Sequence, residues 1–120
     1  MVLAAQIVTG LVILIHIYIF LLETVLFDSR GRRVFGLTAE KAAIVRPAMS
    51  NQGCYNGFLA AALLVGLVHP DPAVAGAFVV YGLACVIVAG IWGAVTVKKT
   101  ILFVQTVPAA VALALHLLAH

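Results

Sequence analysis

Charge is scarce in this sequence. Its 120 residues include seven Lys or Arg and four Asp or Glu, which together make up 9% of the chain. A soluble globular domain carries about a quarter charged residues and about half apolar ones, whereas 65% of this chain is hydrophobic. A chain this small cannot hide so much apolar surface in its own core. The composition therefore excludes a soluble monomer and a disordered chain, and it leaves an integral membrane protein.

Cysteines and catalytic motifs are sparse as well. Cys54 and Cys85 are the only cysteines, both fall inside apolar runs, and their spacing matches no metal motif. There is no Gly-x-Ser-x-Gly, no phosphate loop and no dinucleotide fingerprint. His16 with Glu23 is too small a set for zinc, which takes three or four protein ligands. We therefore expect no disulfide scaffold, no metal and no cofactor.

Long apolar runs occupy most of the chain. A membrane-spanning helix needs roughly 20 mostly apolar residues. We predict four such helices, at about 2–27, 47–68, 73–97 and 101–119. The runs do not alternate in polarity, which excludes barrel strands, and the first run lacks the basic start of a cleaved signal peptide. The expected fold is an all-α four-helix bundle, a single domain over residues 1–120 of a multi-pass protein of the cell membrane.

The basic residues orient this predicted bundle. All of them fall in the first and third loops: Arg30, Arg32, Arg33, Lys41, Arg46, Lys98 and Lys99. Cytoplasmic loops carry such an excess, so both termini are expected on the outer side. The net charge of +3 then needs no nucleic-acid partner, and the first loop could contact anionic membrane lipids. Thr38 predicts the start of a short interfacial helix over about 38–45, and Pro47 should start or kink the second span.

Polar side chains recur at a similar depth in the predicted spans. At 1.5 Å per residue, Glu23 lies about 6 Å and His16 about 16 Å from the cytoplasmic boundary. The same cytoplasmic half also contains Asn51, Gln52, Tyr55, Asn56, Trp92 and Gln105. Polar residues in spans normally face the bundle interior. The sequence therefore predicts a pocket open to the cytoplasm, with Glu23 and His16 as candidate acid–base residues and the other six as candidate binding residues.

The facing of the first two spans follows from helical spacing. His16 and Glu23 are seven residues apart and share one face. We expect that face to meet the side of the second span that carries Asn51 and Tyr55. We also expect Glu23 to accept hydrogen bonds from the amides of the second span, rather than to pair only with a loop arginine.

Each candidate residue also has a plainer interpretation. Glu23 could extend to water or pair with an arginine of the first loop, and His16 could be a neutral histidine bonded to a neighbouring helix. The amides could be interhelical glue. Gln105 could cap backbone carbonyls freed by Pro108, and Trp92 could be an interior or belt aromatic.

Three segments of the sequence resemble a known family. They are HIYIFLLE from His16 to Glu23, NQGCYNGFLA from Asn51 to Ala60, and QTVPA from Gln105 to Ala109. Together they resemble the DUF1304 family of small bacterial membrane proteins, and the resemblance covers nearly the whole chain. It implies a four-helix integral membrane protein and no established activity.

Three functional classes remain open. The pocket could bind or transport a small polar molecule or lipid headgroup, which for transport by four spans requires a homo-oligomer. It could instead be the site of a small membrane enzyme acting on an amphiphile, with Glu23 and His16 as acid and base. The chain could also be a structural or accessory subunit. A small-residue face with Gly90 and Gly93 on the third span permits close packing within the bundle or between copies.

Overall fold

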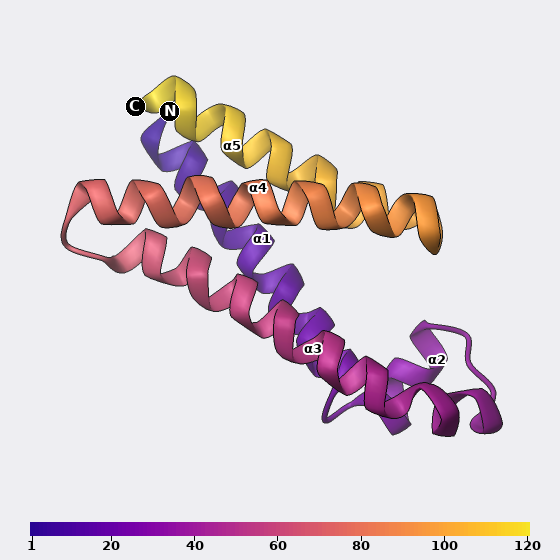
Figure 1. Cartoon of the computed structure of the whole chain (residues 1–120). Helices are drawn as coiled ribbons and strands as arrows, with labels where there is room; N and C mark the ends of the chain where they lie inside the picture. The colour runs from indigo at the N-terminus through magenta and orange to yellow at the C-terminus, as the bar shows by residue number, and fades with distance from the viewer. The chain divides into compact units, whose positions relative to one another are not determined.

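The computed structural model describes every residue from Met1 to His120, and all of its regular elements are helical. In chain order they are α1 (Val2–Glu23), the π-helical turn η1 (Phe27–Gly31), α2 (Arg32–Val34), α3 (Ala39–Val68), α4 (Pro72–Thr96), the π-helical turn η2 (Leu102–Thr106) and α5 (Val107–Ala119) (Figure 1). The predicted all-α fold is confirmed.

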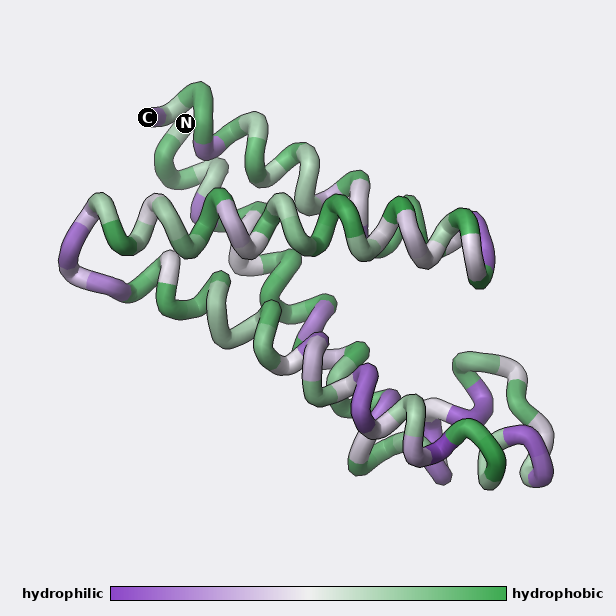
Figure 2. The backbone as a smooth tube through the Cα atoms, viewed as in Figure 1, coloured by the Kyte–Doolittle hydropathy of each residue, from purple (hydrophilic) through white to green (hydrophobic).

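Three segments are long and apolar enough to cross a membrane: Val2–Glu23, Pro72–Thr96 and Leu102–Ala119. They coincide closely with the first, third and fourth predicted spans. The second predicted span is helical too, as the later part of α3. That helix is less apolar than the other three, because it starts with charged residues and carries the amides of residues 51–56 (Figure 2).

The start of α3 follows the sequence, but the second predicted span does not begin at Pro47. Thr38 Oγ1 accepts a hydrogen bond from the backbone N–H of Lys41 at 3.2 Å, as an N-cap residue does. The helix then continues through Pro47 without a break. The segment predicted as a separate interfacial helix is therefore the first part of α3.

The first apolar helix ends in a wide turn. The backbone N–H of Leu26 donates to Leu21 O, and that of Gly31 donates to Leu26 O, both at 2.8 Å. These bonds reach back five residues, the pattern of a π-helix. A Cβ atom at Gly31 would lie 2.0 Å from Leu22 O, so only glycine fits this turn.

Contacts divide the chain into two units, which we describe separately. Unit 1 comprises Met1–Ile15 and Leu59–His120, and unit 2 comprises His16–Phe58. The apolar core lies in unit 1, where Leu63, Leu83 and Val86 are fully buried.

Within unit 1, α4 packs closely against η2 and α5 (Figure 1). A Cβ atom at Gly90 would lie 2.1 Å from Thr106 Oγ1, and one at Gly93 would lie 2.9 Å from Ile101 Cγ2. The Thr106 hydroxyl donates a hydrogen bond to Ile87 O of α4 at 3.1 Å. The small-residue face of the third predicted span thus allows close packing inside the chain.

One end of unit 1 brings together both termini and the turn between α3 and α4 (Figure 1). A hollow of about 230 Å³ there is lined by Val2, His69, Pro72, His116 and His120, among others. Asp71 caps α4 at this end, since its carboxylate accepts from the Ala73 N–H at 2.9 Å. Lys98 and Lys99 follow the opposite end of α4.

Candidate functional site

In unit 2, two glycines let α3 approach the end of α1. A Cβ atom at Gly53 would lie 2.7 Å from Thr24 Cγ2 and 3.0 Å from Glu23 Cβ. One at Gly57 would lie 3.3 Å from the ring of Phe20. The two glycines are four residues apart and share a face of α3, the spacing of small residues that lets membrane helices pack closely. Glu23 therefore meets the backbone of α3 at short range.

A hydrogen bond between side chains crosses this contact. Asn56 Nδ2 donates to Glu23 Oε1 at 2.7 Å and also to the backbone carbonyl of Gln52 at 3.2 Å. Both side chains of the pair are buried, with Glu23 7% and Asn56 5% exposed. Glu23 thus accepts a hydrogen bond from an amide of the second predicted span, as the sequence analysis predicted.

Glu23 has no counter-ion in the chain. The only ion pair joins Arg46 and Asp28, whose side chains are 47% and 71% exposed. The alternative in which Glu23 pairs with an arginine of the first loop does not describe the structure. A carboxylate has about four acceptor positions, and Glu23 uses one of them on Asn56.

The side of α3 that faces Glu23 is not the predicted one. Asn51 and Tyr55 were expected there, whereas Gly53, Asn56 and Gly57 contact α1. Asn51 and Gln52 have exposed side chains, and Tyr55 is 57% exposed and packs edge-on against Phe58. The glycines select the contact face, and Asn56 lies on it three residues after Gly53. Adjacent residues of a helix are rotated by about 100°, which turns Tyr55 away from Glu23.

The other candidate residues are placed as follows. His16 is fully buried, two turns before Glu23 on α1. Seven residues span about 10.5 Å along a helix, so the two side chains cannot exchange a proton directly. Gln105 is buried in η2, and Trp92 is 71% exposed on α4, as a belt aromatic would be. Both lie in unit 1, and their grouping with Glu23 stays a prediction.

Two features of unit 2 escaped the sequence analysis. The Gly53-x-x-x-Gly57 spacing was visible and signals close helix packing. Arg30 Nε donates to the Tyr18 hydroxyl at 2.7 Å, and its guanidinium lies 5.8 Å from the Tyr18 ring centroid. No sequence pattern signals that pair, because the two residues are twelve positions apart, Tyr18 on α1 and Arg30 within η1.

Apolar helices of membrane-crossing length and a buried polar contact between helices are the features of a helical membrane protein. The model of the family described as "Protein of unknown function (DUF1304)" matches residues 10–117, which include every candidate site residue. The chain belongs to this family, as its motifs predicted. No curated protein and no solved structure matches it significantly.

Proposed function

We propose that the chain crosses the cell membrane four times as a single bundle. Val2 at the start of α1 and Pro72 at the start of α4 line the same hollow of unit 1. If α1 and α4 both cross from that side, the chain between them must return across the membrane. The helix available for the return is α3, whose 30 residues extend about 45 Å, more than the roughly 30 Å of a hydrocarbon core.

The basic residues orient these four crossings. Three of the seven lie between α1 and α3, two more lie in the first part of α3, and the other two follow α4. The turn between α3 and α4 contains none. The positive-inside tendency then places the basic segments in the cytoplasm and both termini outside. In this orientation the first turns of α3 lie at the cytoplasmic surface, and the Glu23 site lies in the cytoplasmic half of the membrane.

The polar site around Glu23 binds or transports a small polar molecule or a lipid headgroup. The observation that carries this proposal is a buried carboxylate with one amide donor and no cation, held where two helices meet. Ionisable side chains inside membranes are costly and mark functional sites by default. A ligand with N–H or O–H donors, or with a cationic group, complements the open acceptor positions of Glu23. Transport would in addition require several copies of the chain.

Two other functions make different demands on the same residues. An enzyme would use Glu23 and His16 as acid and base, which their separation allows only through water or substrate. An accessory subunit would need the bond between Asn56 and Glu23 only as glue. Binding of a ligand that requires the charge of Glu23 would argue against the accessory role. Release of that ligand without chemical change would argue against the enzyme.

Native mass spectrometry of the purified protein tests the proposal. The parent is compared with Glu23→Gln, which keeps the size of the side chain and one oxygen that can accept from Asn56 but removes the charge. Glu40→Gln is the matched control, because Glu40 is an exposed carboxylate at the start of α3.

We expect a small molecule or lipid to remain bound to the parent and to Glu40→Gln, and to be lost from Glu23→Gln at unchanged melting temperature. Identical mass profiles for all three proteins would contradict a binding role for Glu23.

A further inference from the structure

A second polar hollow lies in unit 2, on the segment that joins α1 to α3. It has a volume of about 420 Å³ and is lined by Ser29, Arg30, Arg33 and Val34. These residues come from η1 and α2, which follow each other without a break. Their spacing of three and four positions places them on one face of consecutive helical turns. Two arginines and a hydroxyl are thereby presented together.

Arg30 is held in place by Tyr18. Its Nε donates to the Tyr18 hydroxyl at 2.7 Å, and the guanidinium lies over the Tyr18 ring. An arginine has five N–H donors, so the four terminal ones remain for another partner. Arg33 is exposed and forms no ion pair. The hollow therefore contains one positioned guanidinium and a second that can join it.

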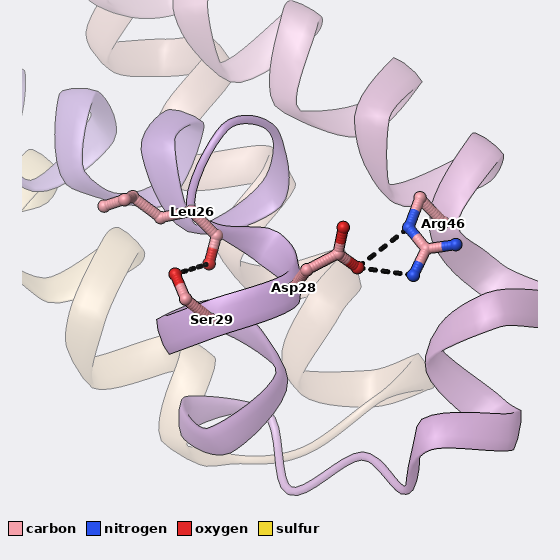
Figure 3. A network of polar contacts seen from close by, with 4 residues as sticks. All are labelled: Leu26, Asp28, Ser29 and Arg46. Atoms are coloured by element: carbon pink, nitrogen blue, oxygen red, sulfur yellow. Dashed lines mark hydrogen bonds and ion pairs between the residues drawn. The ribbon is translucent and has the colours of Figure 1, made fainter.

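The carboxylate of Asp28, which precedes Ser29 in the chain, is paired with another arginine. Asp28 accepts from Arg46 Nε at 2.9 Å and forms an ion pair with the same guanidinium. Figure 3 shows Asp28 directed toward Arg46, whereas Ser29 leaves the same turn in another direction, toward the carbonyl of Leu26. No carboxylate lines the hollow. Its charge is therefore positive and is not cancelled within the hollow.

We propose that Ser29, Arg30 and Arg33 form a binding site for a phosphate group. The planar guanidinium fork matches the oxygens of phosphate with two parallel hydrogen bonds. The Ser29 hydroxyl donates its one hydrogen to Leu26 O at 3.4 Å, a long bond that it can exchange for one to a phosphate oxygen. Tyr18 is a positioning residue, because it acts by holding Arg30. The inference is independent of the function proposed for Glu23.

The phosphate can belong to an anionic phospholipid or to a soluble compound. The place of the site favours the phospholipid, because the segment directly follows an apolar helix of membrane-crossing length. Headgroups of anionic lipids gather basic segments at that level. Val34 adds an apolar side chain at the rim, against which the glycerol part of a lipid can pack.

The test compares two variants with equal charge change. Arg30→Gln/Arg33→Gln removes the cations that line the hollow, and Arg32→Gln/Lys41→Gln removes two basic residues of the same unit that do not line it. Binding of phosphatidylglycerol to each protein in neutral detergent is measured by native mass spectrometry. Diacylglycerol with the same acyl chains is the probe without phosphate, and inorganic phosphate at millimolar concentration is the soluble competitor.

We expect Arg30→Gln/Arg33→Gln to bind phosphatidylglycerol about tenfold more weakly, and Arg32→Gln/Lys41→Gln to stay within about twofold of the parent. Diacylglycerol binding should be the same in all three. Tyr18→Phe, which keeps the ring but removes the acceptor of Arg30 Nε, should weaken phosphatidylglycerol binding about two- to threefold without changing diacylglycerol binding.

Each other outcome has a definite meaning. Displacement of the lipid by inorganic phosphate, in a manner sensitive to Arg30→Gln/Arg33→Gln, supports the site and assigns it to soluble phosphates. Equal weakening in both double variants would mean that charge acts diffusely and would overturn the site. Unchanged binding in both would overturn it as well.

Discussion

Asn56 uses both hydrogens of its amide, one on Glu23 across the helix contact and one on the carbonyl of Gln52 in its own helix. This double use fixes the orientation of the amide. It also means that Asn56 has no further hydrogen to give a ligand, so the proposed ligand would have to bind through Glu23.

Replacing Glu23 separates its charge from its hydrogen bonding. Glu23→Gln should melt close to the parent, since its side-chain carbonyl still accepts from Asn56. Glu23→Leu should lower the free energy of unfolding by about 1–3 kcal/mol, because a buried amide donor loses its partner. Thermal melting in detergent measures both. If Glu23→Leu is as stable as the parent, the bond to Asn56 contributes nothing.

Asn56 and Asn51 offer a matched pair on the same helix. Asn56→Asp places a second carboxyl against Glu23 and removes the donor, so we expect a loss of about 1–3 kcal/mol at neutral pH. Asn51→Asp makes the same chemical change at an exposed position and should shift the melting temperature little. Equal shifts for the two variants would show that the contact between Asn56 and Glu23 is not formed in the protein.

At this scale the sequence predicted the bond of Glu23 to an amide but not which amide supplies it. Depth along the helix is fixed by residue number, so Glu23 and the amides of α3 were correctly expected at one level. Rotation about the helix axis is fixed by packing, and Gly53 and Gly57 decide it. The rotation of α3 is therefore set by two glycines. Because glycine has no polar side chain, a search for polar residues does not find them.

Among the elements, the crossing of α1 and α3 depends on the absence of a side chain at Gly53. Gly53→Ala introduces a Cβ 3.0 Å from Glu23 Cβ and 2.7 Å from Thr24 Cγ2. The helices must then separate, and the bond between Asn56 and Glu23 lengthens with them. We expect a loss of about 1–3 kcal/mol, as for other overpacked contacts, together with weaker ligand retention.

Gly10→Ala is the control for that variant. Gly10 also lies inside a helix, but a Cβ atom there meets nothing within 4 Å. Alanine favours the helix by up to about 1 kcal/mol over glycine, so the melting temperature should stay or rise. A fall as large as that of Gly53→Ala would show that glycine is needed for a reason other than the helix contact.

Element boundaries followed the sequence where a cap or an apolar run defines them. Thr38 begins α3, and α4 covers the predicted third span almost residue for residue. The course of the chain through Pro47 and the π-helical turns η1 and η2 was not predicted. In η1 the backbone N–H groups of Leu26 and Gly31 bond five residues back, and Gly31 lies against the carbonyl of Leu22. Local helix propensity does not report such a pattern.

For the whole molecule, composition alone indicated a membrane protein, and the family match over residues 10–117 agrees with the motifs in the sequence. The distribution of basic residues was equally visible. To infer a membrane orientation from the basic residues, one must know which helix ends lie together. In unit 1 the hollow lined by Val2, Pro72 and His116 identifies three such ends. The positions proposed for Glu23 and for the arginine hollow relative to the membrane depend on the proposed topology.

Labelling of single cysteines with a membrane-impermeant maleimide tests that topology most directly. In a background with Cys54→Ala and Cys85→Ala, one cysteine is introduced at a time by Glu40→Cys, Pro70→Cys, Thr100→Cys or His120→Cys, all at exposed positions. Four crossings with basic segments inside predict that Pro70→Cys and His120→Cys react in intact cells. Glu40→Cys and Thr100→Cys should react only after the membrane is opened. Reaction of Glu40→Cys and Pro70→Cys from the same side would contradict the crossing of α3, and with it the proposed placement of the Glu23 site in the cytoplasmic half of the membrane.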